Sequence, residues 1–185
     1  MDHPPAVILA GGKATRMGGG DKPLMIWRGR MLVDWVREAL EPQVSRIALN
    51  ANGDPARFDR LGLPVLADDL PDCGPLSGVL TAMTWASAAG ASHVLVVAGD
   101  TVTLPPDLVA RLSPGPAYAA SQIDGEWRAH PTVGLWPTSL ADGLRSYLIS
   151  GERRVMGWAR SIGAAEVRFD GAVIRNINTP DDLAR

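Results

Sequence analysis

A glycine-rich segment near the N-terminus has the composition of a polyphosphate-binding loop. The run Val7–Lys22 opens with apolar residues and then holds five glycines together with Lys13, Arg16 and Lys22. Glycine has no Cβ, so the backbone can approach a phosphate closely, and consecutive N–H groups form a nest that binds anions. The segment therefore predicts a triphosphate site in which Arg16 and Lys22 neutralise the terminal phosphates. The alternative is an ordinary strand-to-loop turn with solvated basic side chains.

Two well-known phosphate-binding signatures do not fit this segment. The P-loop places its lysine directly after a glycine, whereas Asp21 separates Gly20 from Lys22. The dinucleotide fingerprint Gly-x-Gly-x-x-Gly also fails, because Gly18-x-Gly20 leads to Pro23 where the third glycine should stand. The predicted loop therefore belongs to another class of phosphate site.

A carboxylate follows the most continuous apolar run of the chain. His93–Ala98 predicts a central buried strand, and Asp100 comes just after it. This position lies at the edge of an open α/β sheet where ligands bind, opposite the glycine loop. A carboxylate beside a triphosphate is repulsive unless a hard cation lies between them, and Mg²⁺ is commonly held by one or two carboxylates plus phosphate oxygens. We predict that Asp100 is a catalytic Mg²⁺ ligand; the alternative is an aspartate that caps the next turn.

Further polar residues stand where they would face the same edge. Asn50 and Asn52 follow a predicted strand, although asparagine is also common in turns. Asn176 and Asn178 are two positions apart in an extended segment, so their amides point to the same side and are candidates for binding a substrate or the metal. The pair Arg153–Arg154 is a candidate for an anionic second substrate, against the commoner role of solvated surface charge.

A helix start provides another candidate anion site. Pro75, preceded by Gly74, is well suited to the first position of a helix. The free N–H groups of a helix N-terminus can hold an anion or a base edge. The alternative is simply a well-started helix.

The elements that position these residues alternate between strands and helices. Strands are predicted at Ala6–Leu9, Arg46–Asn50, Pro64–Ala67, His93–Ala98, Ala117–Gln122 and Thr132–Leu135, the last two flanking a turn at Asp124-Gly125 with Glu126–Pro131 between them. Helices are predicted at Met31–Leu40, at Pro55–Leu61, from Pro75, after Pro105, around Leu140–Leu148, around Val155–Ala159 and from Pro180. Strand, helix and strand form a right-handed βαβ unit with parallel pairing. We predict one Rossmann-like three-layer α/β/α domain over residues 1–185, with a mostly parallel, mixed central sheet.

Composition narrows the class of protein. The net charge is −2 and basic residues form no run, which argues against a nucleic-acid partner. No apolar stretch approaches the length of a membrane span, and Met1–Pro5 does not resemble a signal peptide. The single cysteine, Cys73, excludes an internal disulfide. We expect a cytoplasmic monomer that binds no membrane.

The run Leu9–Lys22, Leu-Ala-Gly-Gly-x-x-x-Arg-Met-Gly-Gly-x-Asp-Lys, resembles the opening loop of the molybdenum cofactor guanylyltransferases. These enzymes belong to the larger nucleotidyltransferase group. Further motifs follow in the order that the family uses, namely Gly74–Gly78, Asp100, His130-Pro131, Gly151–Arg154 and Asn176–Pro180. The resemblance covers nearly the whole chain.

The resemblance implies a site for GTP and molybdopterin with Asp100 on Mg²⁺. It implies that Asn50 and Asp68 lie near the guanine and ribose, with the neighbouring Asp69 left open as the alternative to Asp68. The molybdopterin side would hold Arg154, Asn176 and Asn178. The residues implied around GTP are Leu9, Ala10, Gly11, Gly12, Lys22, Asn50, Asp68, Gly74 and Asp100.

The expected reaction is transfer of GMP from GTP to the terminal phosphate of molybdopterin or Mo-molybdopterin, with Arg16, Lys22 and Asp100 as the catalytic residues. It forms the guanine dinucleotide cofactor and pyrophosphate, and contacts with molybdoenzyme-maturation proteins are expected. The nearest alternative is a related transferase that uses CTP or another phosphorylated acceptor, such as a sugar-1-phosphate. An alternative of a different class is a non-catalytic GTP-binding module, which would not require the carboxylate of Asp100.

Overall fold

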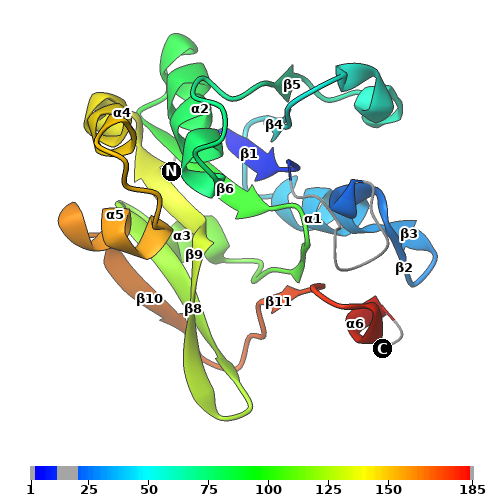
Figure 1. Cartoon of the computed structure of the whole chain (residues 1–185). Coiled ribbons are helices and arrows are strands. Elements are labelled where there is room, and N and C mark those ends of the chain that lie inside the picture. The colour runs from blue at the N-terminus through cyan, green and yellow to red at the C-terminus, as the bar shows by residue number, and fades with distance from the viewer. Residues whose placement is uncertain (1–2, 12–20, 184–185) are drawn as a thin grey trace.

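The chain folds around one seven-stranded mixed sheet, and the computed structural model describes residues 3–11 and 21–183 (Figure 1). Its strands, in spatial order, are β10 (Ala165–Phe169), β8 (Ala117–Ile123), β9 (Glu126–Pro137), β6 (His93–Ala98), β1 (Ala6–Leu9), β4 (Ile47–Asn50) and β5 (Val65–Leu66). Strand β1 pairs in parallel with β4 and β6, whereas β9 is antiparallel to both of its neighbours. The predicted mostly parallel sheet with β6 at its centre is confirmed.

Helices cover both faces of this sheet, as the prediction of three layers requires. On one face lie α1 (Leu32–Leu40) and α3 (Leu108–Leu112); on the other lie α2 (Pro75–Ala88), α4 (Ala141–Ile149) and α5 (Val155–Ser161). The alternation of side chains along a strand explains the division, since Ile8 packs with the first group and Val7 with the second. None of the helices in the described ranges is long and apolar enough to cross a membrane.

Several shorter elements lie outside the seven-stranded sheet. The 3-10 helices are η2 (Lys22–Leu24), η3 (Pro55–Leu61) and η4 (Thr138–Leu140). A short hairpin joins β2 (Ile26–Trp27) to β3 (Arg30–Met31), and β7 (Thr101–Thr103) pairs antiparallel with β11 (Arg175–Asn176). The last helix, α6 (Pro180–Leu183), begins at the predicted Thr179-Pro180 cap: Asp182 N–H donates to Thr179 Oγ1 while the Asp182 carboxylate accepts from Thr179 N–H.

Strand β9 is longer than predicted, and the expected connection at Glu126–Pro131 is wrong. The turn residues Asp124 and Gly125 both have positive φ, at 53° and 79°, so β9 pairs with β8 directly after a two-residue turn. Pro131 lies in a bulge within β9, not in a connection between strands. Ala119 pairs with His130 while the preceding Tyr118 pairs with Gly134, so that residues 131–133 have no partner on β8. A missing N–H at Pro131 therefore costs the sheet no ladder bond.

His130 connects this bulge to the segment that leads into β11. Its Nε2 lies 2.9 Å from Ser121 Oγ, and Ser121 Oγ accepts a hydrogen bond from the Ile174 N–H. The Ser121 hydroxyl still has its own proton, which it can donate to an unprotonated Nε2. Burial lowers the pKa of His130 below the usual value for histidine, which favours the same neutral ring.

Protonation of His130 should therefore destabilise the fold under mildly acidic conditions. An unfolded histidine takes up a proton near pH 6.5, before the folded one does, so the free energy of unfolding should fall as pH drops from about 7 to about 5.5. His130→Gln should remove this part of the pH dependence, as measured by urea unfolding at the two pH values. The wild-type chain is measured in parallel, and an unchanged slope in His130→Gln would contradict the prediction.

Candidate active site

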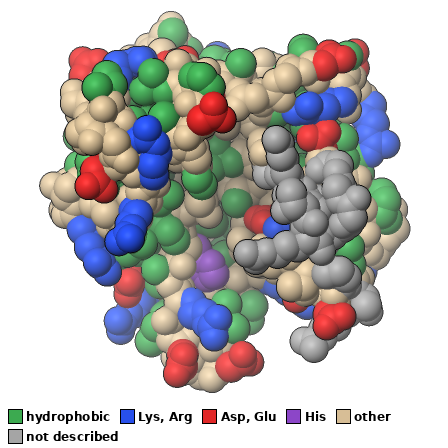
Figure 2. Space-filling view, viewed as in Figure 1, with side chains coloured by type: hydrophobic (Ala, Val, Ile, Leu, Met, Phe, Trp, Pro, Cys, Tyr) green, Lys and Arg blue, Asp and Glu red, His purple; other side chains and the backbone are tan. Residues whose placement is uncertain are grey.

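A cavity opens at the carboxyl ends of β1, β4 and β6, where ligands bind in open α/β sheets. It measures about 540 Å³, and Figure 2 shows this face of the molecule hollowed near its centre. A second cavity of about 510 Å³, near Pro5, Arg46 and His93, lies at the opposite ends of the same strands and holds none of the predicted site residues. The first cavity is lined by most of the predicted nucleotide-binding residues, namely Leu9, Gly11, Lys22, Asn50, Asp68, Gly74 and Asp100.

Lys22 and Asp100 form an ion pair inside this cavity. The Lys22 Nζ lies 2.5 Å from Asp100 Oδ2 and also donates to Asn178 Oδ1 at 2.9 Å. The two charged side chains are only 15% and 16% exposed, so their attraction is screened less than that of a surface pair. Helix η2 presents Lys22 here because Pro23 packs closely on the end of β6: a Cβ on Gly99 would lie 2.9 Å from Pro23 Cγ.

The C-terminal segment reaches Asp100 through the pairing of β7 with β11. Asn176 lies opposite Thr101, and the Ile177 N–H donates to the Asp100 carbonyl at 2.9 Å. The Asn176 side chain donates from Nδ2 to Asp100 Oδ1 at 3.3 Å, while its own Oδ1 is buried and has no hydrogen-bond partner among the described residues. Asn176 thus contacts Asp100 and Asn178 contacts Lys22, so both amides lie at the same ion pair, on one side of their segment as the spacing predicted.

The donor set around Asp100 suits a hard cation. It consists of oxygen atoms that could serve as ligands: the Asp100 carboxylate, the Oδ1 of Asn176 and the Oδ1 of Asn178. Within the described ranges no group of three or more histidine, cysteine or acidic side chains could hold a metal by itself. This composition matches the pattern of Mg²⁺ sites, in which substrate phosphates and water complete the coordination.

A second polar cluster forms the wall at the end of β4. The two carboxylate oxygens of Asp68 accept hydrogen bonds from Asn50 Nδ2 at 2.8 Å and from Asn52 Nδ2 at 2.7 Å. The Asp68 N–H donates in return to Asn52 Oδ1 at 2.8 Å. Asp69, the alternative to Asp68, instead accepts from Arg145 at 3.1 Å and does not line the cavity. The geometry favours Asp68 at the nucleotide.

Gly78 sets the position of Asn50 within this wall. A Cβ built on Gly78 would lie 2.3 Å from Asn50 Oδ1 and 2.6 Å from Leu9 Cδ2. Gly78→Ala should therefore displace both side chains and raise the Kd for nucleotide about tenfold or more, as measured by calorimetry. Gly143→Ala is the matched control in helix α4, because its Cβ would meet Trp158 at an ordinary 3.5 Å. Equal nucleotide affinities in the two variants would refute this role of Gly78.

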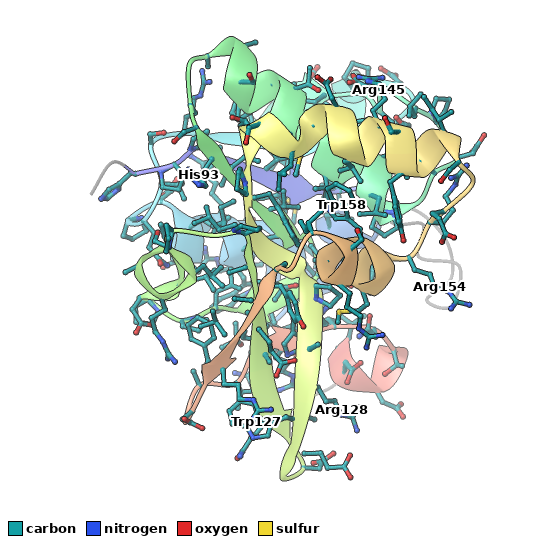
Figure 3. The ribbon with its side chains drawn as sticks, turned by 90° about the vertical axis from the view of Figure 1, so that its left-hand side faces the viewer. His93, Trp127, Arg128, Arg145, Arg154 and Trp158 are labelled. Carbon is teal, nitrogen blue, oxygen red and sulfur yellow. The ribbon has the colours of Figure 1, made fainter. Side chains whose placement is uncertain are left out.

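Several predicted residues lie outside this cluster. Ala10 is buried and does not line the cavity. Gly12 and Arg16 lie outside the described residues. Arg154 stands at the N-terminus of α5 and is not part of the cavity lining (Figure 3).

The sequence assigned no site role to four polar residues that line the cavity, namely Asp21, Arg57, Asp72 and Thr132. Asp21 and Arg57 form an ion pair, and Thr132 is presented by the bulge of β9. Asn52 was expected at this edge of the sheet but not among the nucleotide contacts, and it bonds to Asp68. The position of Asn52 after a predicted strand was a usable signal. Nothing local to Arg57 or Thr132 distinguishes either residue from an ordinary surface position.

Comparison with known proteins identifies the family. Residues 6–165 match the family model described as the MobA-like NTP transferase domain. The chain is 49% identical over 180 residues to a molybdenum cofactor guanylyltransferase from Cereibacter sphaeroides (strain ATCC 17029 / ATH 2.4.9), covering 97% of this chain and 93% of the relative. It is 44% identical to the protein of the same name from Mesorhizobium japonicum, with 97% and 92% covered.

Solved structures with little sequence identity share the fold. Molybdopterin-guanine dinucleotide biosynthesis protein A from Archaeoglobus fulgidus matches with a TM-score of 0.68 at 22% identity, over 98% of this chain and 95% of that one. The inositol-1-phosphate CTP transferase from T. maritima matches with a TM-score of 0.74 at 16% identity, over 99% and 92%. The family model and the relatives show that this chain is a nucleotidyltransferase of the MobA-like NTP transferase family.

Proposed function

We propose that this chain transfers GMP from GTP to the terminal phosphate of molybdopterin, producing the guanine dinucleotide form and pyrophosphate. The observation that carries the proposal is the ion pair of Lys22 with Asp100 in the cavity at the carboxyl ends of the strands, with Asn178 accepting a hydrogen bond from Lys22. A cation, a carboxylate and an amide oxygen are the groups that phosphoryl chemistry requires, and the curated relatives bear the name of this activity.

The nucleoside would bind against the wall formed by Asn50, Asn52 and Asp68. The hydrogen bonds among these residues hold the carboxylate of Asp68 in one orientation, so a ligand meets a preorganised acceptor. Leu9 and Gly11 line the cavity beside this wall, so the backbone of Leu9–Gly11 would lie along the phosphates. Gly12 and Arg16 keep their predicted roles as further phosphate contacts.

Mg²⁺ would be held by Asp100, with Asn176 or Asn178 contributing an amide oxygen. When bound, the ion would act as a Lewis acid on the phosphate oxygens. Lys22 would stabilise the negative charge that develops on the pyrophosphate leaving group.

The chain's own task in this reaction is positioning. An oxygen of the acceptor phosphate attacks the α-phosphorus in line, the bond to the β-phosphate oxygen breaks, and pyrophosphate leaves; no covalent enzyme intermediate is required. Asn176 and Asn178 come from the β11 segment and not from the β4 wall, so they would orient the acceptor. Arg154 keeps its predicted role in acceptor binding as part of this proposal.

Pyrophosphate release tests the proposal against its alternatives. The chain is given molybdopterin and Mg²⁺ with GTP, CTP, ATP or UTP in separate reactions. Release with GTP alone supports guanylyl transfer, whereas release with CTP alone keeps the mechanism and overturns the choice of base. GTP binding with no release from any nucleotide would favour a binding module.

A further inference from the structure

The described lining of the cavity carries more negative than positive charge, although a triphosphate is to bind there. Its acidic side chains are Asp21, Asp68, Asp72 and Asp100, and its cations are Lys22 and Arg57. Asp100 is paired with Lys22, and Asp68 is held by two asparagine amides. Asp21 is the residue directly before Lys22, so its carboxylate lies close to the expected phosphates and needs a counter-charge of its own.

Arg57 supplies that counter-charge. Its Nε lies 3.0 Å from Asp21 Oδ2, and its Nη2 donates to the carbonyl oxygen of Asn52 at 2.5 Å. The guanidinium thus joins the start of η2 to the loop after β4, on two sides of the same cavity. Asp21 is the N-cap of η2, yet its side chain accepts no hydrogen bond from that helix because it is directed to Arg57.

The structure of helix η3 directs the Arg57 side chain toward Asp21. Helix η3 begins with Asp54, whose side chain accepts from the Ala56 N–H, and ends at Gly62 in the left-handed conformation. Phe58 and Leu61 anchor the helix in the core, and the Arg57 guanidinium lies 5.0 Å from the Phe58 ring centroid. The arginine is therefore presented by a fixed element.

We propose that Arg57 is a positioning residue of the nucleotide site that acts through Asp21: it neutralises this carboxylate and holds it away from the phosphates. The inference rests on the proposed binding of a nucleoside triphosphate in this cavity. The two side chains are 33% and 26% exposed, and exposed ion pairs contribute little to stability. The pair should act instead on the affinity for a charged ligand. The loss of affinity on removing Arg57 should therefore grow with the number of phosphates on the ligand.

Calorimetric titration with GTP, GMP and guanosine tests this role in the full-length chain. Arg57→Gln leaves Asp21 unpaired and should raise the Kd for GTP about tenfold, with a smaller increase for GMP and about none for guanosine. The KM for GTP should rise while kcat changes little, because Lys22 and Asp100 are untouched. The loss should shrink in high salt.

The double variant Asp21→Asn/Arg57→Gln tests whether Arg57 acts through Asp21. It lacks both charges and should recover most of the GTP affinity, whereas Asp21→Asn alone should bind GTP more tightly than the wild-type chain. Arg168→Gln is the matched control, since Arg168 forms an exposed ion pair with Glu166 at 3.1 Å on strand β10, at the far edge of the sheet from β4.

Three results would overturn the role of Arg57: an unchanged GTP affinity in Arg57→Gln, an equal loss for guanosine and GTP, or no recovery in the double variant. An equal loss for guanosine would mean that Arg57 contacts the nucleoside itself. Failure of the wild-type chain to bind GTP would instead refute the proposed function, so the two outcomes are distinguishable.

Discussion

Asp100→Asn should lower the rate of pyrophosphate release about a thousandfold while leaving the fold intact. The amide can still accept from Asn176 through its oxygen, so the β7–β11 pairing and the adjoining backbone should persist. Its nitrogen, however, would face the Lys22 ammonium, which is now 2.5 Å from a carboxylate oxygen. The site would lose both the charge that orients Lys22 and the one carboxylate that its donor set offers to Mg²⁺.

Single-turnover release of pyrophosphate at saturating GTP, molybdopterin and Mg²⁺ measures this loss. Thermal unfolding of the variant checks that the fold survives. Asp124→Asn is the control, because Asp124 stands at the tip of the β8–β9 hairpin at a φ of 53°, a conformation that asparagine adopts readily. A rate in Asp100→Asn within about tenfold of wild type would remove Asp100 from the catalytic residues.

The residues near Asp100 could be predicted because they obey a rule of sheet geometry. Apolar runs mark β1, β4 and β6, and polar residues just beyond parallel strands must gather at one edge of the sheet. The positions of Asn50 and Asp100 followed from this rule. Asn176 and Asn178 could be assigned to one side of their segment by the period of an extended chain, but their approach to Asp100 depends on the β7–β11 pairing.

Other features depend on contacts that no local pattern encodes. Asp68 and Asp69 are neighbours of the same type, and only the packing of α2 and α4 turns Asp69 toward Arg145. Pro131 was expected in a connection before the strand, whereas a bulge accommodates it within β9 and places Thr132 in the cavity. The ion pair of Asp21 with Arg57 joins two loops that meet only when β1 and β4 pair.

Lys22→Gln should produce the second large loss, about a hundredfold in kcat/KM for GTP, for a reason that differs from that of Asp100→Asn. Glutamine can still donate a hydrogen bond to Asn178 or Asp100, so the change removes charge more than contact. The missing charge should matter most where negative charge develops, on the departing pyrophosphate. Affinity for pyrophosphate and GTP should therefore fall much more than affinity for GMP, as titration of each ligand would measure.

Lys22→Arg separates charge from shape in the same experiment. Arginine keeps the positive charge but replaces a compact ammonium with a planar fork, which cannot occupy the space between Asp100 Oδ2 and Asn178 Oδ1 in the same way. Recovery of pyrophosphate affinity with only partial recovery of rate would mean that charge governs binding of the leaving group and that geometry governs its departure. Equal losses for GMP and GTP in Lys22→Gln would instead place Lys22 at the α-phosphate, because that is the phosphate the two ligands share.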